Sequence, residues 1–250
     1  MSDNEIDCPE DLLDRYLAGD PANPGEASGR EAAEKWLRDR KGVIDPKALT
    51  RSDRYEFIAY AFKHYYQIVT EAIRKYDPNH LYLGSRLNFT AGQFDNPWFW
   101  KAVAPFHDVV SVNYYHRWGP QDTEIANWAE WGDKPVMFTE WYAKALDAKN
   151  LSNVGGGGWI VRTQKDRGEY YQHFALGALE NPQVVGFHYF KYQDDQTDAK
   201  GYDREGGCNK GLVDSNEQPY APLLDQARSI NTVAYPLIKF FDERRTAPTR

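Results

Sequence analysis

The chain has 250 residues, a formal net charge of −7 and 41% hydrophobic residues, which is too apolar for disorder throughout and too acidic for a nucleic-acid-binding protein. Its two cysteines, Cys8 and Cys208, cannot build a disulfide framework or a zinc site, and no apolar run has the length of a membrane span. We therefore expect a folded domain without a metal or cofactor and with no membrane or nucleic-acid partner.

The first third of the chain predicts helices and loops. Residues 1–8 are acidic and polar, so they lack the character of a secretory signal and resemble a frayed terminus. The clearest helix has Thr50 or Ser52 as its N-cap and an apolar stripe that we expect to face a sheet. The expected elements are helices at 11–17, 31–40 and 51–76, with a loop at 19–30.

From residue 81 onward, the pattern alternates between strands and helices. The expected strands cover 81–86, 108–115, 135–140 and 184–190, and the expected helices cover 97–106, 122–131, 164–179 and 220–241. A long loop at 143–163 contains four consecutive glycines, which indicate a mobile or closely approached backbone and no phosphate loop, since no GKS or GKT follows. This alternation predicts a parallel sheet covered by helices.

Polar residues gather where these strands end. They are Arg86, Asn113, Tyr114, Tyr115, His116, Glu140 and residues 191–194. A doubly wound sheet would usually have a glycine-rich turn after its first strand, and none of these strands is followed by one. Polar groups at several strand exits favour a parallel α/β barrel, whose chemistry lies at the C-terminal ends of its strands.

The segment PVMFTEWY at 135–142 is the most informative of these exits. Its apolar run is too short for a helix and fits a buried strand that ends on Glu140. A carboxylate at the exit of an apolar strand is costly to bury without a partner or a task. The pattern by itself leaves two interpretations open: a catalytic carboxylate, or a strand-end glutamate that reaches solvent.

An ordered set of segments resembles the C-terminal half of β-agarases and their relatives. The segments are DNEIDCPEDLLDRYL, DPNHLYLGSR, DVVSVNYY, PVMFTEWYAK, TQKDRGEYYQHFALGALENPQVVGFHYFKYQDD and NKGLVDSNEQPYAPLL. This family consists of retaining glycoside hydrolases built on a (β/α)8, or TIM, barrel. The resemblance implies that residues 1–250 are a single half of that catalytic domain, a partial barrel with strands 5–8 and the end of strand 4. Such enzymes are often secreted, and the compartment of this chain stays open.

The resemblance also implies roles for individual residues. Glu140 matches the nucleophile at the end of strand 7, and Asn4-Glu5 matches the Asn-Glu pair at the end of strand 4, so Glu5 would be the acid/base. Asn4 would bind the sugar 2-hydroxyl. Taken without the resemblance, Glu5 and Asn4 are solvated residues near a chain end. Strands 1–3, with the substrate-binding residues they carry in the family, have no counterpart here.

Several further residues are candidate substrate contacts. Tyr114 or Tyr115 would orient Glu140, and only one of the two can point inward on an alternating strand. The other candidates are Arg86, Asn113, His116, Trp141 and His188, each of which has a structural or solvated interpretation beside the functional one. Trp141 and Trp159 could stack on sugar rings, although buried aromatic residues are commoner.

An acidic stretch follows the last expected strand. It contains Asp194, Asp195, Asp198 and Asp203, and carboxylate oxygens are the ligands that calcium prefers. The spacing does not match an EF-hand, and Lys200 and Arg204 interrupt it. The sequence therefore favours a solvated loop over a metal site.

Two functions from different classes remain. The first is a retaining hydrolase of a β-linked galactose polysaccharide such as agar, with Glu140 and Glu5 as its carboxyl groups. The second is a non-catalytic half-barrel that binds saccharide or needs a missing N-terminal half. Four strands cannot close a barrel, so open sheet edges would promote self-association.

Overall fold

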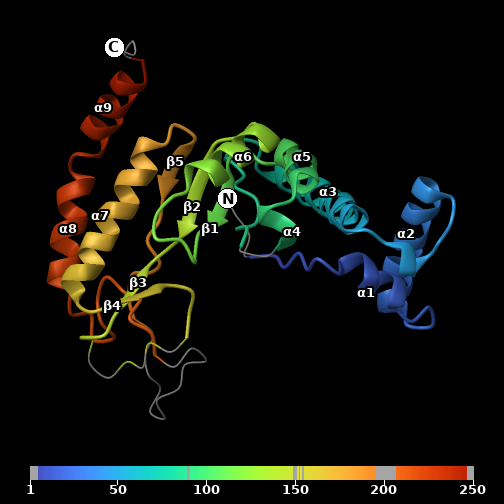
Figure 1. Cartoon of the computed structure of the whole chain (residues 1–250), viewed down its shortest axis with the longest axis horizontal. Coiled ribbons are helices and arrows are strands. Elements are labelled where there is room, and N and C mark those ends of the chain that lie inside the picture. The colour runs from blue at the N-terminus through green and yellow to red at the C-terminus, as the bar shows by residue number, and fades with distance from the viewer. Residues whose placement is uncertain are drawn as a thin grey trace. The chain divides into compact units, whose positions relative to one another are not determined.

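The computed structural model describes residues 5–88, 91–148, 151, 153, 155–194 and 207–246. These residues fall into two compact units (Figure 1). The first unit comprises Met1–Val110 and Asn127–Lys134, and the second comprises Ser111–Ala126 and Pro135–Arg250. The described part of the chain contains no helix that is both long and apolar enough to cross a membrane.

The first unit is built from helices. Its elements are α1 (Leu12–Ala18), α2 (Pro24–Lys41), η1 (Pro46–Ala48), α3 (Arg51–Tyr76), α4 (Ala91–Phe94), α5 (Pro97–Val103), η2 (Ala104–Phe106) and the second half of α6 (Asp122–Gly132). Helices α1, α2 and α3 meet around a core of fully buried residues: Leu13, Ala33, Leu37 and Phe57. The predicted helices at 11–17, 51–76 and 97–106 are confirmed, the last as α5 followed by the short helix η2.

Helix α2 begins within the region predicted as a loop. The side chain of Asn23 accepts a hydrogen bond from the backbone N–H of Gly25, and Pro24 occupies the first helical position. An Asn cap followed by proline is a strong helix start, because proline at this position loses no hydrogen bond. The loop predicted at 19–30 was therefore wrong from residue 24 onward, and the helix predicted at 31–40 is the second half of a longer one.

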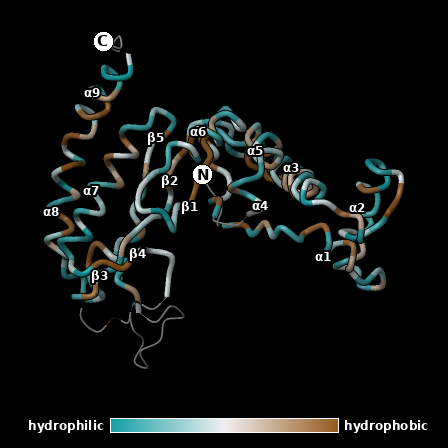
Figure 2. Tube along the Cα trace, in the orientation of Figure 1, coloured by the Kyte–Doolittle hydropathy of each residue, from teal (hydrophilic) through white to brown (hydrophobic). Residues whose placement is uncertain are grey.

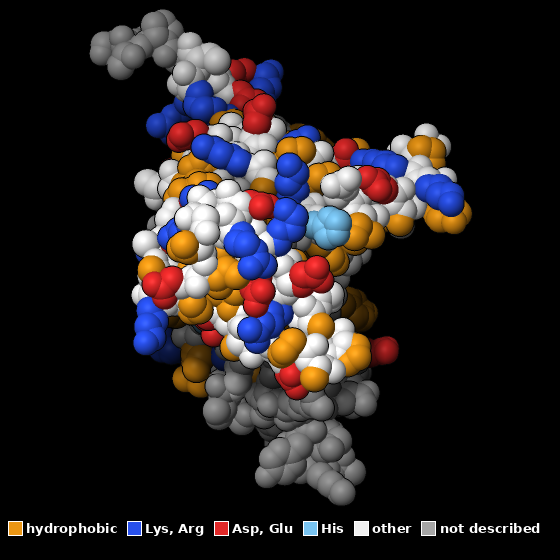
Figure 3. All heavy atoms as spheres, turned by 90° about the vertical axis from the view of Figure 1, so that its right-hand side faces the viewer, with side chains coloured by type: hydrophobic (Ala, Val, Ile, Leu, Met, Phe, Trp, Pro, Cys, Tyr) orange, Lys and Arg blue, Asp and Glu red, His pale blue; other side chains and the backbone are white. Residues whose placement is uncertain are grey.

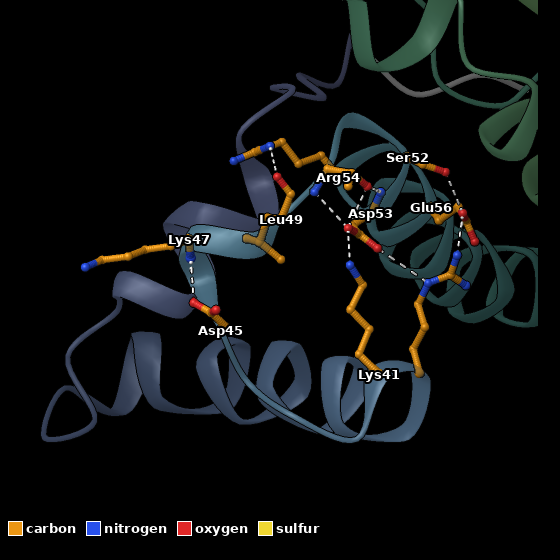
Figure 4. A network of polar contacts seen from close by, with 10 residues as sticks. Lys41, Asp45, Lys47, Leu49, Ser52, Asp53, Arg54 and Glu56 are labelled. Atoms are coloured by element: carbon orange, nitrogen blue, oxygen red, sulfur yellow. Dashed lines mark hydrogen bonds and ion pairs between the residues drawn. The ribbon is translucent and has the colours of Figure 1, made fainter.

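A network of charges joins the end of α2 to the start of α3 (Figure 4). Lys41 Nζ lies 2.5 Å from Asp53 Oδ2, and Arg40 donates to Glu56 at 2.6 Å. Asp53 also accepts from the backbone N–H of Thr50, at 2.8 Å, which completes a capping box. Burial raises the pKa of Asp53, but the hydrogen bonds from Lys41 and Thr50 outweigh it and lower the pKa to about 2. The carboxylate is thus stabilised in its charged form.

The apolar stripe of α3 packs on helices rather than on a sheet. Helix α3 contacts α1 and α5, and its buried positions are concentrated between Asp53 and Ala59, with Tyr66 further on, while its last residue, Tyr76, is 80% exposed. Residues 81–84 have no regular strand structure, and Ser85 and Leu87 are single bridge residues. The expected strand at 81–86 is therefore absent as a regular element, and the prediction that α3 faces a sheet was wrong.

The second unit contains the sheets. Strands β1 (Val110–Asn113), β2 (Val136–Glu140) and β5 (Val184–Phe187) form one sheet in the order β1-β2-β5, and β2 and β5 are parallel. A second sheet pairs β3 (Ala143–Ala145) with β4 (Trp159–Val161), also in parallel. The expected strands at 108–115, 135–140 and 184–190 are confirmed with shorter bounds. The long loop predicted at 143–163 contains β3 and β4. Each of these strands has only three residues, which is too short for an alternating hydrophobic pattern to be recognised.

Helices cover this unit. They are α7 (Gln164–Glu180), α8 (Ala221–Asn231), α9 (Ala234–Thr246) and the first half of α6. Helix α7 packs beside α8 (Figure 1) and also contacts β3, β5 and α9. In Figure 2, the tube of α8 alternates between hydrophilic and hydrophobic stretches, as expected of a helix with one buried face. The single helix predicted at 220–241 is in fact two, because α8 ends at Asn231 and α9 starts at Ala234.

The mixed α/β class is confirmed, with parallel pairing in both sheets. The described strands form one sheet of three and one of two, and the half-barrel stays a prediction. On the face shown in Figure 3, Lys and Arg side chains are interspersed with Asp and Glu side chains.

Candidate active site

Glu140 is the last residue of β2, and its side chain is buried in the second unit, with 7% of its surface exposed. Its backbone carbonyl accepts a hydrogen bond from the N–H of Tyr114 at 2.7 Å, which fixes the strand exit against the end of β1. Its carboxylate Oε2 accepts a hydrogen bond from the Tyr115 hydroxyl at 2.6 Å. A buried carboxylate needs such donors, because each one offsets part of the cost of leaving water.

The two adjacent tyrosines have different partners. Tyr114 is fully buried and donates to Glu124 at 2.7 Å, while its hydroxyl accepts from the N–H of Gln121 at 3.0 Å. Burial, reinforced by Glu124, raises the pKa of Tyr114. Tyr114 therefore fastens the start of α6 to the strand exit, and Tyr115 is the phenol that reaches Glu140.

Asn113 ties the ends of two strands together. It is fully buried, and its side-chain oxygen accepts a hydrogen bond from the Thr139 hydroxyl at 2.9 Å. Thr139 immediately precedes Glu140, so this contact fixes the approach of β2 to its exit. Asn113 is thus placed beside the candidate site, in a position that holds the backbone.

Aromatic rings continue from Tyr115 along the site. The Tyr115 and Tyr142 rings are edge-to-face at 5.5 Å, and the Tyr142 and Phe190 rings are 5.9 Å apart. The Lys210 ammonium lies 5.9 Å from the Tyr142 ring centre and 5.7 Å from that of Phe190. The N–H of Phe190 donates to the carbonyl of Trp141, which extends the pairing between β2 and β5. A chain of ring contacts thus runs from Tyr115, the partner of the Glu140 carboxylate, to Tyr142 and Phe190, and the buried Lys210 lies near the last two rings.

Sequence reasoning missed three of these residues. Tyr142 lies two positions after Glu140. In an extended chain, side chains two positions apart point to the same side, and this spacing could have placed Tyr142 beside Glu140. Phe190 ends the last expected strand and was not singled out. Lys210 lies in one of the segments that carry the resemblance, but no feature of the sequence assigns it a role.

The glycine run at 155–158 packs against this wall. A Cβ atom at Gly157 would lie 2.9 Å from Cγ of Tyr115, and one at Gly158 would lie 2.5 Å from Cδ2 of Tyr142. Neither distance leaves room for a side chain. Of the two alternatives that the sequence left open, a mobile or a closely approached backbone, Gly157 and Gly158 show the close approach.

The tryptophans separate into core and surface. Trp141 is fully buried and stacks on Phe174 at 3.9 Å with 5° between the ring planes, so its ring belongs to the core. Trp159 is 42% exposed and Trp118 is 46% exposed, and their rings meet edge-to-face at 6.2 Å. Of the two tryptophans considered for sugar stacking, Trp159 has an exposed ring.

The remaining candidates are divided between the two units. His116 and His188 lie in the second unit and are exposed, and His116 has a positive φ of 59°. Arg86, half-buried, and Glu5, exposed, belong to the first unit. Asn4 lies outside the described residues. The pairing of Glu5 with Glu140 therefore stays a prediction.

Asp194, the first aspartate of the acidic stretch after β5, is not solvated as we expected. Asp194 is buried and accepts hydrogen bonds from the N–H of Gly211 at 2.6 Å, the Tyr220 hydroxyl at 2.6 Å and Asn209 Nδ2 at 3.0 Å. It therefore holds the 207–213 segment in place. Asp195, Asp198 and Asp203 lie outside the described residues. The described residues contain no group of three His, Cys, Asp or Glu side chains suited to a metal ion.

Buried Arg167 fixes the same segment from α7. Its guanidinium donates to the carbonyl oxygens of Ala143 and Gly211, each at 2.9 Å, and to the Tyr189 hydroxyl at 2.9 Å. Because one guanidinium joins β3, the end of β5 and the 207–213 segment, it connects the backbone that surrounds Tyr142 and Phe190.

Comparison with known proteins identifies relatives. No family model matches the chain. It is 31% identical to β-agarase B of Vibrio sp. (strain JT0107) over 237 residues, which cover 91% of this chain and 23% of that protein. It is also 31% identical to β-agarase A of the same organism over 184 residues, which cover 72% of this chain and 18% of that protein.

Solved structures give the same result. The crystal structure of BpGH50 superposes with a TM-score of 0.84 and 36% identity, covering 96% of this chain and 50% of that one. The structure of an exo-β-agarase superposes with a TM-score of 0.71 and 29% identity, covering 84% of this chain and 30% of that one. This chain therefore spans half or less of each relative. The resemblance expected from the sequence is confirmed: over most of its length, the chain is a homologue of the β-agarases of glycoside hydrolase family 50.

Proposed function

We propose that this chain carries the catalytic carboxylates of a retaining glycoside hydrolase that cleaves a β-linked galactose polysaccharide of the agarose type. Glu140 is the nucleophile and Glu5 is the acid/base. One observation carries the proposal: a buried glutamate at the exit of β2, held by the Tyr115 hydroxyl at 2.6 Å, in a chain homologous to β-agarases. Exo-β-agarase and agarase structures among the relatives support this class of substrate.

The reaction has two displacements. In the first, a Glu140 oxygen forms a bond to the anomeric carbon while the glycosidic C–O bond breaks, and Glu5 gives its proton to the leaving oxygen. In the second, Glu5 takes a proton from a water molecule whose oxygen attacks the anomeric carbon, and Glu140 leaves as a carboxylate. Net retention of configuration requires the two carboxyl groups to be about 5–5.5 Å apart.

Tyr115 has a defined task in this scheme. Its hydroxyl donates to the carboxylate, which favours the charged form of Glu140 and fixes the side chain before the sugar binds. As Glu140 forms its bond to the anomeric carbon, the carboxylate loses negative charge, and this hydrogen bond weakens. A correctly oriented carboxylate contributes to the rate because it removes the cost of orienting the nucleophile during the reaction.

The same proposal covers the architecture. We propose that residues 1–250 correspond to the C-terminal half of a (β/α)8 barrel, with β1, β2 and β5 as strands 6, 7 and 8, and the segment around Ser85 as strand 5. Parallel pairing of β2 with β5 and the superposition on half of BpGH50 support this assignment. The site at the exit of β2 then lies at the end of the barrel where such enzymes work.

The experiment compares Glu140→Gln with a matched control, Glu130→Gln, which changes an exposed glutamate on α6. Hydrolysis of agarose-derived oligosaccharides is followed by reducing ends, and the anomeric product is read by proton NMR. We expect the initial product to be the β-anomer and Glu140→Gln to lose at least about 1,000-fold in kcat with an unchanged circular dichroism spectrum. A Glu140→Gln rate equal to that of the control would contradict the proposal.

A further inference from the structure

A buried lysine lies beside the candidate site without a role in the scheme above. Lys144, in the middle of β3, has only 2% of its surface exposed. Its ammonium donates to the backbone carbonyls of Gly155 at 2.5 Å and Gly156 at 3.2 Å, and both acceptors are neutral. An ammonium that is buried against neutral carbonyls loses water, which is costly for a charged group. Burial indeed lowers the pKa of Lys144.

The segment that Lys144 holds is fastened at both ends. At its start, the Cys208 thiol donates to the same Gly155 carbonyl at 3.0 Å. At its end, β4 pairs with β3, so that Trp159 lies opposite Ala143 and Ile160 opposite Lys144. The four glycines between these anchors form no part of a regular element, and Gly156 has a positive φ of 76°, which suits glycine. Without its anchors, such a segment would have many accessible conformations.

Between the anchors, the segment lies against the ring that contacts Glu140 and against the neighbouring ring of Tyr142. Gly157 lies against Tyr115 and Gly158 against Tyr142, each too close for a Cβ atom. The Tyr115 hydroxyl in turn donates to the Glu140 carboxylate at 2.6 Å. Contacts thus run without interruption from the Lys144 ammonium, through the glycine backbone and the Tyr115 ring, to the candidate nucleophile.

We propose that Lys144 is a positioning residue: by binding the carbonyls of Gly155 and Gly156, it holds the glycine segment against Tyr115 and thereby keeps the Tyr115 hydroxyl on Glu140. The consequence for catalysis rests on the proposed function, since it acts through the nucleophile. The other part of the proposal, that Lys144 holds the glycine segment against the Tyr115 ring, depends only on contacts within the second unit; we call it the mechanical part.

The first measurement tests the mechanical part by hydrogen–deuterium exchange on the full chain. The variants are Lys144→Met, which removes the ammonium but keeps the stem, Lys144→Arg, which keeps a cation, and Lys165→Met, which changes an exposed lysine on α7. We expect exchange in peptides covering 155–161 to rise about tenfold or more in Lys144→Met and to stay near wild type in the other two, with α8 unchanged in all three. Unchanged exchange at 155–161 in Lys144→Met would overturn the proposal.

The second measurement tests the consequence for catalysis. In Lys144→Met, kcat should fall by no more than in Tyr115→Phe, roughly 10- to 150-fold, while KM stays within about threefold, because the nucleophile is misplaced and the sugar-binding surface is kept. Lys144→Arg should recover most of the loss. The double variant Lys144→Met/Tyr115→Phe should be no slower than Tyr115→Phe alone, because both changes remove the same contact. Multiplicative losses would show that Lys144 acts elsewhere and would reject the proposal.

A third variant covers failure of Lys144→Met to fold. Gly157→Ala leaves Lys144 in place and puts a methyl group 2.9 Å from Cγ of Tyr115, so the ring must move. Its kcat should match that of Tyr115→Phe, and a wild-type kcat would refute the link between segment and ring. If the wild type hydrolyses no agarose-derived substrate, the proposed function fails, and the exchange experiment with Lys144→Met still decides whether Lys144 holds the glycine segment.

Discussion

Tyr115→Phe is the variant whose effect can be worked out most directly from the contacts of Glu140. The substitution removes one hydroxyl and leaves the ring, which packs on Tyr142 at 5.5 Å. The substitution removes the hydrogen bond of 2.6 Å from the phenol to the carboxylate of Glu140, a residue with 7% of its surface exposed. Fold and site shape should therefore stay the same while the nucleophile loses a donor.

The size of the effect follows from the kind of hydrogen bond. A bond to a charged, buried group contributes about 1.5–3 kcal/mol, and 1.36 kcal/mol corresponds to a factor of ten. If the whole contribution serves to orient and stabilise the reacting carboxylate, kcat/KM should fall by roughly 10- to 150-fold. The loss should appear mainly in kcat, because Tyr115 contacts the nucleophile in our scheme and not the body of the sugar.

The neighbouring residue provides a matched control. Tyr114→Phe removes the adjacent phenol, which is more deeply buried and whose hydrogen bond of 2.7 Å goes to Glu124 instead of Glu140. We expect it to lower the free energy of unfolding by about 1–3 kcal/mol and to leave kcat within about threefold of wild type. Both variants are assayed with the same agarose-derived oligosaccharide. Equal kcat losses in the two variants, or none in Tyr115→Phe, would refute our account of the site.

Three further predictions concern stability, substrate and association. Hydrogen bonds from Lys41 and Thr50 outweigh the effect of burial and lower the pKa of Asp53 from 3.8 to about 2. The charged carboxylate therefore stabilises the folded chain by about 2 kcal/mol above pH 3.8. This contribution is lost as the pH falls through about 2. Urea unfolding should thus separate Asp53→Asn from wild type by about 2 kcal/mol at neutral pH and by almost nothing near pH 2, and a constant difference would contradict this. Trp159→Ala should raise KM for agarose-derived oligosaccharides about fivefold at unchanged kcat, since an exposed ring can stack on a sugar face, and an unchanged KM would exclude that contact. If the edge of β5 mediates self-association, light scattering should find the wild type larger than a monomer and Val185→Lys monomeric, whereas a monomeric wild type would reject the idea.

Much of the fold could be predicted because local signals agreed with the tertiary structure. Helix α3 has the expected bounds, since apolar spacing and a Thr50 cap marked the same start. Strand β2 followed from its short apolar run. The break between α8 and α9 was missed although Pro236 marked it: proline fits the first turn of a new helix and disrupts the interior of an old one.

The candidate site was only partly within reach of the sequence. Glu140 could be predicted because a carboxylate at a strand exit is unusual. Which of Tyr114 and Tyr115 contacts it could not be predicted from the sequence. Strand β1 ends at Asn113, so the two-residue alternation no longer governs the direction of either tyrosine. Lys144 and Lys210 escaped because their partners are backbone carbonyls and rings distant in sequence, for which no short motif exists.

The most direct test of the central claim is to trap the glycosyl-enzyme. The chain is incubated with a 2-deoxy-2-fluoro agarose-derived oligosaccharide that carries a good leaving group, and its peptides are sequenced by mass spectrometry. Because the fluorine slows the second displacement more than the first, a retaining enzyme accumulates its covalent intermediate. We predict one glycosyl group per chain, attached to Glu140. A label on another carboxylate, or hydrolysis of the unfluorinated substrate without any label, would contradict the assignment of Glu140 as nucleophile.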